Sequence, residues 1–278
     1  MKKILITGGG GQLASSFYSM FQNKYQIFCL PRKEFDVTNI DQIESVLQKY
    51  NPDTILHCAA MTDVDGCEKN PILAERINSQ SIEKIVNVFK GDFLYISTDY
   101  VFDGSSGPYE ETDTPNPINI YGKTKLLGEK ILQKSSENWT IIRTNVLFDF
   151  QSEASFLSWI INSLKEEKDI KVVDDQFNNP IWVNDFSYVI DLVIANDIKG
   201  LFHIGSNKIY SRYEFAIMIA KVFGLNFKKI HPMKTQKLNQ IAKRPLKSGL
   251  KFDKLKSEIK FEDIDLNKSL RELKNKFH

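Results

Sequence analysis

The sequence predicts an α/β fold in which a doubly wound parallel sheet is followed by a smaller C-terminal lobe. Through the first half of the chain, short apolar runs rich in β-branched residues alternate with longer amphipathic runs, the pattern of parallel strands covered by helices. Beyond about Gln151 this alternation loosens into helices and short connectors. A chain of 278 residues can bury one large core with an added lobe, or form two small domains.

The individual elements are predicted from the spacing of apolar residues. Strands are expected at 4–6, 27–30, 55–57, 93–96, 139–147 and 170–173. Helices are expected at 40–50, 73–89, 156–164 and 213–223, with a mixed, lysine-rich region at 250–277. Open α/β sheets bind ligands at the carboxyl ends of their strands, so functional residues are expected in the segments that follow the strands.

Composition and charge exclude several classes of function. The 37 basic and 35 acidic residues nearly balance, so nucleic acid is not expected as a partner. No apolar run approaches the roughly 20 residues of a transmembrane helix, and Met1 leads into a short strand instead of a signal peptide. Three cysteines without a close pair fit a reducing cytoplasm. The four histidines lack metal-ligand spacing, so a cytoplasmic protein with no membrane partner and no catalytic metal is predicted.

A glycine-rich turn directly follows the first predicted strand. It comprises four glycines at 8–11 and continues into a helix that contains Ala14. Backbone amides of such a turn can approach a pyrophosphate, and the helix N-terminus adds a favourable field. Glycines at 8 and 11 with a small residue at 14 match the spaced dinucleotide-binding fingerprint. The sequence therefore predicts a Rossmann-like domain whose first cofactor-binding residues are Gly8, Gly11, Gln12 and Leu13.

The second predicted strand ends in a basic turn. The acidic residue that grips the adenosine ribose in many such domains is missing, and Arg32 and Lys33 stand there instead. These cations could pair with a 2′-phosphate, which favours NADPH and leaves NADH open, or they could form a solvent-facing turn. Asp36 and Val37 are candidates for contact with the adenine edge, although Asp36 could equally cap the next helix.

Tyr121 and Lys125 form the candidate catalytic pair. They lie four residues apart in a predicted helix, so their side chains share one helix face. A free tyrosine titrates near pH 10, and an adjacent ammonium would lower the pKa of Tyr121 toward neutrality. Taken alone, a tyrosine four residues before a lysine is common and usually structural.

Two strand ends add to this pair. The fourth predicted strand ends in Ser97, Thr98 and Asp99, which places two hydroxyls and a carboxylate at the expected ligand edge of the sheet. The third is followed by small or slender residues that would let a flat cofactor lie close, namely Ala59, Ala60 and Met61.

With these motifs the chain resembles the extended short-chain dehydrogenases/reductases, and among them the dTDP-4-dehydrorhamnose reductase family. The likeness covers nearly the whole length, at the glycine loop and at 36–38, 59–68, 97–104, 121–125, 143–144, 175–180, 200–215 and 244–245. The family's catalytic threonine, tyrosine and lysine fall on Thr98, Tyr121 and Lys125. Its accessory aspartate falls on Asp99.

The resemblance implies NADPH-dependent reduction of the C4 ketone of a nucleotide-activated deoxysugar, in the biosynthesis of cell-surface polysaccharide sugars. Tyr121 would give a proton to the developing alkoxide, Thr98 would hydrogen-bond that oxygen, and Lys125 would bind the nicotinamide ribose. Dehydratases of the superfamily carry a second carboxylate after the aspartate, whereas Tyr100 follows Asp99 here, so dehydration is disfavoured. An epimerase and a non-catalytic NADP-binding regulatory subunit remain alternatives.

The expected partner is a nucleotide sugar, and a homodimer stays open. The family usually carries a tryptophan that packs on the sugar two residues after Thr144, where this chain has Val146. Trp182 could compensate for the lost stacking surface, or it could be a core residue. The resemblance thus implies dehydrorhamnose or a related ketosugar on dTDP or UDP as the expected substrate. Residues 1–147, completed by about 170–197, are expected to form the NAD(P)-binding domain, and 148–169 with 198–278 the substrate-binding lobe.

Overall fold

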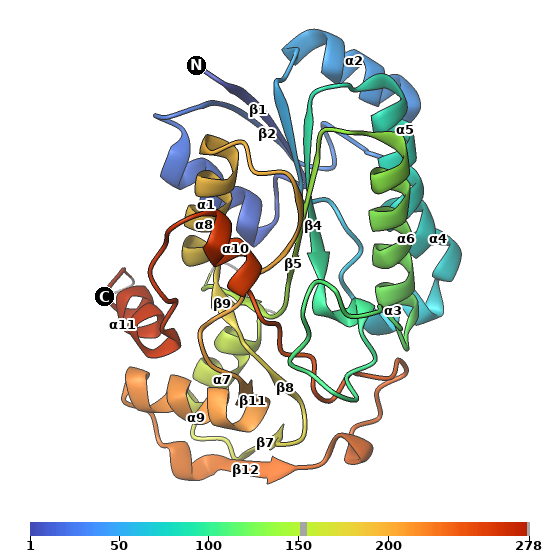
Figure 1. The fold of residues 1–278 in the computed structure, drawn as a ribbon. Helices are drawn as coiled ribbons and strands as arrows, with labels where there is room; N and C mark the ends of the chain where they lie inside the picture. Colours follow the sequence, from blue (N-terminus) through green and yellow to red (C-terminus); the bar gives the residue numbers. More distant parts are fainter. Residues whose placement is uncertain (151–154, 277–278) are drawn as a thin grey trace.

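A six-stranded parallel sheet forms the centre of the computed structural model, which describes residues 1–150 and 155–276 (Figure 1). The strand order is β10-β5-β4-β3-β1-β2. The strands are β1 (Lys3–Thr7), β2 (Gln26–Leu30), β3 (Thr54–His57), β4 (Asp92–Thr98), β5 (Trp139–Thr144) and β10 (Gly200–His203). The chain leaves β1 toward β2 on one side and returns to β3 on the other, so the order reverses at β1 and opens a ligand crevice there. The predicted α/β fold is confirmed.

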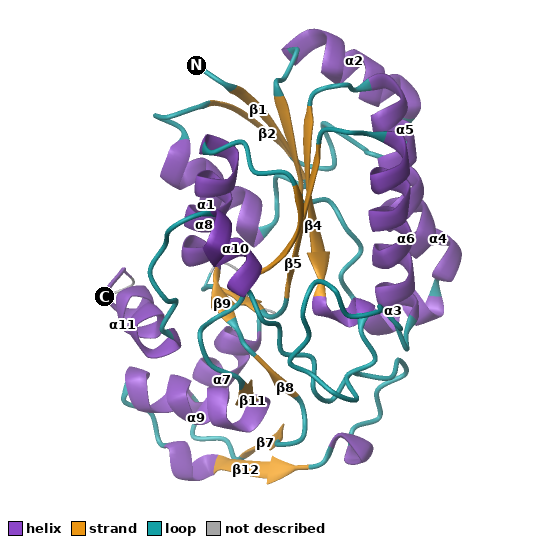
Figure 2. Cartoon of the chain, in the orientation of Figure 1, coloured by secondary structure: helices purple, strands orange, loops and turns teal. Residues whose placement is uncertain are grey.

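Helices cover both faces of this sheet, as Figure 2 shows. One face carries α2 (Ile40–Tyr50), α5 (Ser81–Val88) and α6 (Ile120–Ser135); the other carries α1 (Gln12–Phe21), α8 (Val183–Ala195) and α10 (Asp253–Glu258). Alternate residues of β1 enter opposite cores: Leu5 packs into the α2, α5 and α6 cluster, whereas Ile4 and Ile6 pack into the α1 and α8 cluster. This period of two lets one apolar strand hold two helical layers.

The sixth strand of the sheet differs from the prediction. Residues 170–173 do form a strand, β7 (Ile170–Val173), but it pairs with β12 (Ile230–Met233) in a separate two-stranded sheet. The sixth position belongs to β10, which pairs with β5 from Gly200 opposite Thr140 to His203 opposite Arg143. An apolar run predicts a strand but not its partner, because pairing is decided by the tertiary path of the chain.

Two other predicted elements are subdivided. The strand expected at 139–147 ends as β5 at Thr144, and β6 (Leu147–Phe148) pairs instead with β9 (Ile181–Trp182). The helix expected at 73–89 runs through α4 (Pro71–Glu75), a π-helical turn at Arg76–Gln80 and α5; the short α3 (Val64–Lys69) precedes it.

The second part of the chain lies below the carboxyl ends of the strands in Figure 1. Its core joins α7 (Phe156–Lys165), α9 (Arg212–Phe223), α11 (Leu266–Lys276), β7 and β12. Helix α9 begins with a capping box between Ser211 and Glu214 and ends at Gly224 in the left-handed region. Both β10 and α10, expected in the lobe, pack with the sheet instead. The division into two functional domains stays a prediction.

Candidate active site

A cleft of about 1320 Å³ lies at the carboxyl ends of β1, β3, β4 and β5. It brings together the glycine turn after β1, the loop after β3, the end of β4 and the first turns of α6. The predicted site residues that line it are Gly8, Gly11, Gln12, Leu13, Arg32, Asp36, Val37, Ala59, Ala60, Met61, Thr98, Tyr121 and Lys125. Residues more than a hundred positions apart in the sequence therefore share one cavity.

The glycine turn is fixed between two neighbouring strand ends. Gly8 has a φ of +70°, and a Cβ there would lie 2.9 Å from the backbone of Ala59. A Cβ on Gly9 would lie 2.7 Å from the backbone of Leu30, to which the Gly9 amide donates a hydrogen bond of 2.9 Å. Only glycine allows both approaches. The turn delivers the N-terminus of α1, capped by Gly11 and free of acidic residues in its first turn, to the cleft, where it can hold an anion.

The basic turn after β2 also reaches the cleft through Arg32. Asp36 stabilises a local turn, because its Oδ1 accepts hydrogen bonds from the Thr38 amide at 2.9 Å and hydroxyl at 2.8 Å, whereas the N-cap of α2 is Asn39. Although burial opposes its ionisation, these bonds and the charges of Arg32 and Arg76 hold the pKa of Asp36 below its usual value. Two guanidinium groups thus lie near the Asp36 carboxylate at this end of the cleft. The sequence did not indicate Arg76, because nothing in its helical pattern distinguishes it from other helical residues.

Helix α6 is pressed against the end of β4. A Cβ on Gly122 would lie 2.0 Å from the Tyr100 carbonyl oxygen, so only glycine lets the helix approach this closely. The N-cap residue Asn119 accepts a 2.8 Å hydrogen bond from the Gly122 amide and donates one of 2.9 Å to the Lys243 carbonyl. This packing places Tyr121 in hydrogen-bond contact with Thr98.

The pKa of Tyr121 moves in the direction opposite to the one expected. Burial raises it well above its usual value, and the hydrogen bond with Thr98 opposes this only in part. The Lys125 ammonium donates a 2.7 Å hydrogen bond to the Ile96 carbonyl and lies 4.0 Å from the centroid of the Tyr95 ring. Tyr121 is therefore held as a neutral phenol, the form that can give a proton to a developing alkoxide.

A buried ion pair lies one helical turn beyond Lys125. Burial lowers the pKa of Lys125 to about 7, and the charge of Glu129 opposes this shift. The Glu129 carboxylate accepts two hydrogen bonds from Arg143, at 2.9 and 2.7 Å, and one of 2.5 Å from the Ser97 hydroxyl. Sequence reasoning missed Glu129, although its spacing of four from Lys125 was a usable signal.

A second missed residue is Asn78, fully buried in the π-helical turn. Its side chain accepts a hydrogen bond of 2.8 Å from the Met61 amide and donates to the Met61 carbonyl at 3.2 Å and to Thr124 at 3.0 Å. Asn78 thereby ties the loop after β3 to α6. No sequence pattern indicated it.

Asp99 lies behind Thr98 and does not line the cleft. Its side chain is buried, which raises its pKa to about 7 against the opposing hydrogen bonds from Ser248 and Thr98 and the charge of Arg212. Its polar contacts are with neighbouring protein groups, so it can act only through them. The prediction that Asp99 is accessory is compatible with this position.

The two candidate sugar contacts do not line this cleft. Val146 is half-buried between the lining residues Asn145 and Leu147, and its carbonyl accepts a hydrogen bond from the Ile181 amide. Trp182 is 3% exposed and packs in the core of the second part of the chain, with the Lys276 ammonium over its ring. The structure therefore corrects the assignment of Trp182 as a sugar-stacking residue, because its indole is already covered by protein.

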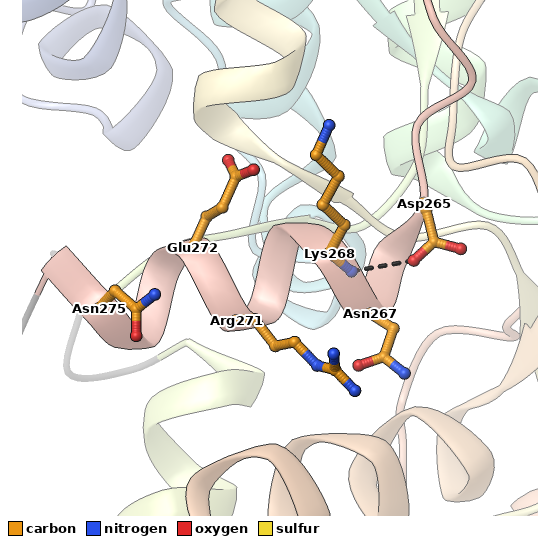
Figure 3. Close-up of a pocket in the computed structure, with 6 residues that line it drawn as sticks. All are labelled: Asp265, Asn267, Lys268, Arg271, Glu272 and Asn275. Atoms are coloured by element: carbon orange, nitrogen blue, oxygen red, sulfur yellow. Dashed lines mark hydrogen bonds between the residues drawn. The ribbon is translucent and has the colours of Figure 1, made fainter.

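A smaller hollow on the surface of α11 has no such chemistry (Figure 3). Its side chains carry charges of both signs, and Figure 3 shows them leaving the helix in different directions; they are Asp265, Asn267, Lys268, Arg271, Glu272 and Asn275. The hydrogen bond of 2.9 Å drawn there joins the Lys268 amide to Asp265 near the start of the helix. This hollow is a solvated helix face.

Membrane spans and metal clusters are both absent from residues 1–150 and 155–276. Within these ranges no helix is both long and apolar enough to cross a bilayer. The same residues contain no group of three or more His, Cys, Asp or Glu side chains that could hold a metal ion. The expected absence of a catalytic metal stays a prediction.

Comparison with known proteins reveals similarity over the whole chain. The model of the RmlD substrate binding domain family matches residues 1–278. A dTDP-4-dehydrorhamnose reductase of Aggregatibacter actinomycetemcomitans is 30% identical over 99% of both chains. The crystal structure of the dTDP-4-dehydrorhamnose reductase of Bacillus anthracis in complex with NADP is 31% identical and superimposes with a TM-score of 0.95, covering 99% of this chain and 100% of that one.

A relative with a different name is equally similar. Methionine adenosyltransferase 2 subunit beta of Rattus norvegicus is 31% identical over 92% of this chain and 82% of its own. The chain is therefore about 30% identical both to a dTDP-4-dehydrorhamnose reductase and to a methionine adenosyltransferase beta subunit.

Proposed function

The chain belongs to the RmlD substrate binding domain family, and we propose that it reduces the C4 ketone of a nucleotide-activated deoxysugar with NADPH. The observation that carries the proposal is the convergence of Thr98, Tyr121 and Lys125 in the cleft headed by the glycine turn. A hydroxyl at the end of β4, with a neutral phenol and a buried amine on α6, are the groups that carbonyl reduction requires. Bound NADPH would supply the hydride.

The cleft fits a dinucleotide in two respects. Gly8 and Gly9 leave no room for side chains on the strand side of the turn, whereas Gly10 faces open space, so the backbone is available to a pyrophosphate. Arg32 at the rim supports NADPH over NADH, because a guanidinium can bind a 2′-phosphate with two hydrogen bonds. The NADP in the Bacillus anthracis relative agrees with this choice.

Each catalytic residue has a distinct task. Tyr121, held neutral by burial, gives its proton to the oxygen of the reacting carbonyl. Thr98 contacts the Tyr121 hydroxyl and orients it. Lys125, anchored on the Ile96 carbonyl, is placed to hold the ribose of the nicotinamide half. The proposed substrate is a 4-keto-6-deoxysugar on dTDP or UDP, either dehydrorhamnose or a related ketosugar.

The replacement Tyr121→Phe tests the proposal, with Tyr188→Phe as control because Tyr188 is exposed on α8, outside the residues that line the cleft. Loss of the phenol is expected to lower kcat by about 10²–10⁴-fold in the oxidation of NADPH by a 4-keto-6-deoxy nucleotide sugar. The dissociation constant for NADPH should change little in either variant. Full turnover by Tyr121→Phe would refute the assignment of the acid.

A second candidate function is that of a regulatory subunit that binds NADP without turnover. The similarity to the beta subunit of methionine adenosyltransferase 2 favours this alternative. Tight NADPH binding by the unaltered protein, with no oxidation across a panel of dTDP- and UDP-ketosugars, would support it. Cofactor that stays bound through purification, with no net oxidation of added NADPH, would instead support an epimerase.

A further inference from the structure

A buried tyrosine lies behind the cleft, between β4 and α6. Tyr95 belongs to β4, is 0% exposed and is not among the residues that line the cleft. Its hydroxyl donates a hydrogen bond of 3.1 Å to the Asn78 carbonyl, and a Cβ on Gly128 of α6 would lie 2.8 Å from the same phenolic oxygen. The hydrogen bond and the close approach of the helix thus fix the Tyr95 ring in one position.

The Lys125 ammonium lies over the face of this ring. Its Nζ is 4.0 Å from the Tyr95 ring centroid, and it donates a hydrogen bond of 2.7 Å to the carbonyl of Ile96, the next residue along β4. An ammonium has three N–H donors, of which this carbonyl takes one. Because Lys125 also lines the cleft, a single strand provides a carbonyl and a ring face to an amine that can still reach a ligand.

Lys125 has no directly paired carboxylate. It is 2% exposed, and in the described part of the chain no carboxylate lies within ion-pair distance of its Nζ. Glu129, one helical turn away, already pairs with Arg143 and accepts the Ser97 hydroxyl. A buried charge without a paired countercharge is costly, so the charge on Lys125 depends on the other groups of negative potential that touch it. These are the Ile96 carbonyl and the ring face of Tyr95.

We propose that Tyr95 is a positioning residue for the reduction: its ring face holds the Lys125 ammonium charged and in place at the cleft, where no carboxylate does so. This role rests on the proposed function, in which Lys125 binds the nicotinamide ribose. Tyr95 acts through Lys125 and touches no reacting atom. A ring suits this task because it attracts a cation without accepting its proton, so the ammonium keeps a donor for the ligand.

The proposed role predicts a pH dependence. The ring stabilises only the charged amine, so it opposes the burial that lowers the pKa of Lys125 to about 7. The other titratable groups that face the amine are Glu129 on α6, whose charge also raises the pKa of Lys125, and His57 and Cys58 at the end of β3. Burial lowers the pKa of His57 to about 3 and raises that of Cys58, so both are neutral at pH 7. Removing the negative charge of the ring face should therefore lower the pKa of Lys125.

The test keeps the ring and changes its charge distribution. Tyr95→Phe retains the ring face and loses only the hydrogen bond to Asn78, whereas trifluorophenylalanine at position 95 fills the same place with little negative charge on its face. In ligand-free protein labelled with 13C at the lysine ε carbons, the Lys125 signal is assigned by its disappearance in Lys125→Met and titrated by NMR. Its midpoint should stay close to that of the unaltered protein in Tyr95→Phe and fall by roughly one pH unit with trifluorophenylalanine. Equal midpoints in these two variants overturn the proposal.

The dissociation constant for NADPH gives a second readout, because the charged amine is the form proposed to bind the ribose. Relative to Tyr95→Phe, the trifluorophenylalanine variant should bind NADPH about tenfold more weakly at pH 9 and at most about twofold more weakly at pH 6. Phe93→Leu is the control, because Phe93 lies on the same strand and in the same core cluster, and any loss of affinity there should be equal at both pH values.

The outcomes separate this proposal from the proposed function. A loss of NADPH affinity that is equal at both pH values in the trifluorophenylalanine variant would indicate a merely structural role for Tyr95 and overturn the proposal, even if the unaltered protein reduces ketosugars. Absence of ketosugar reduction by the unaltered protein would instead refute the proposed function. The lysine titration needs no substrate, so it still decides whether the Tyr95 ring holds the Lys125 ammonium charged.

Discussion

Replacing Glu129 by glutamine should destabilise the protein far more than removing an exposed carboxylate. The side chains of Glu129 and Arg143 are 2% and 3% exposed, and they meet in a bidentate pair with N···O distances of 2.9 and 2.7 Å. Glutamine fills the same volume but leaves the Arg143 guanidinium buried without a countercharge. The third guanidinium nitrogen of Arg143, Nη1, lies 3.3 Å from His203 Nε2. Burial together with the Arg143 charge lowers the pKa of His203, so this ring stays neutral and cannot substitute for a carboxylate.

The magnitude follows from this geometry. Breaking one partner out of a buried, hydrogen-bonded ion pair costs about 3–5 kcal/mol, and the amide introduced by Glu129→Gln can still accept one hydrogen bond, so a loss of about 3 kcal/mol is expected. Glu110→Gln is the matched control, because Glu110 and Lys251 form a pair with side chains 53% and 45% exposed, and such solvated pairs contribute little to stability.

Urea unfolding at pH 7.5 measures the loss of unfolding free energy in Glu129→Gln and in Glu110→Gln. Equal m-values for the two variants and the unaltered protein would show that the same amount of surface is exposed on unfolding, so that the free energies can be compared. The double variant Glu129→Leu with Arg143→Met removes both charges and should recover much of the stability lost in Glu129→Gln. A loss below about 1 kcal/mol in Glu129→Gln would mean that water reaches the guanidinium, and it would refute the inference that this pair is sealed in the core.

Two variants at the cofactor end complete the predictions. Gly8→Ala should lose at least about tenfold in NADPH affinity and roughly 1–2 kcal/mol of stability, because the φ of Gly8 is +70° and a Cβ there would meet the Ala59 backbone. Gly10→Ala is the control and should keep its stability, because a Cβ on Gly10 would face open space. Fluorescence titration measures the affinity and urea unfolding the stability, and unchanged values in Gly8→Ala would refute the close approach of Gly8 to Ala59. Arg32→Ala should weaken NADPH binding by about tenfold and leave NADH binding unchanged, with Lys33→Ala as its control; equal losses for both cofactors would exclude a contact with the 2′-phosphate.

The sequence predicted the fold wherever a local pattern was sufficient. The helix at 40–50 has the bounds that were expected, and the strands at 27–30 and 55–57 differ from β2 and β3 by one residue at their first ends. The strand at 170–173 shows where local pattern ends, since it is a strand that joins a different sheet from the one expected. Strand β10 has only two adjacent apolar residues, Leu201 and Phe202, which is a weak sequence signal for a strand. It occupies the sixth position of the sheet because it pairs with β5.

The candidate site likewise divides into residues that a local sequence pattern reveals and residues that it does not. The glycine turn, Thr98 and the Tyr121/Lys125 pair were found because each motif lies within a few residues of sequence. Ser248 donates to a residue 149 positions earlier, and no local pattern can reveal such a contact. Trp182 illustrates the opposite case: a tryptophan next to a family motif left both a ligand contact and a core position open, and its 3% exposure in the second core favours the core position.

The direction of the Tyr121 pKa shift shows why chemistry is harder to predict than position. From the helical spacing alone, a lysine four residues away should stabilise phenolate, and the sequence contains nothing that opposes this expectation. The structure adds the missing quantity, which is desolvation: Tyr121 and Lys125 both lose water, so the pKa of the phenol rises while that of the amine falls to about 7. Each group is thereby biased toward its neutral form before a ligand binds. The countercharge of Glu129 favours the protonated amine, so Lys125 can bind a ribose hydroxyl as a cation, while burial leaves Tyr121 a proton donor. Burial, rather than the spacing of the two residues, therefore sets the proton on Tyr121 that a reduction needs.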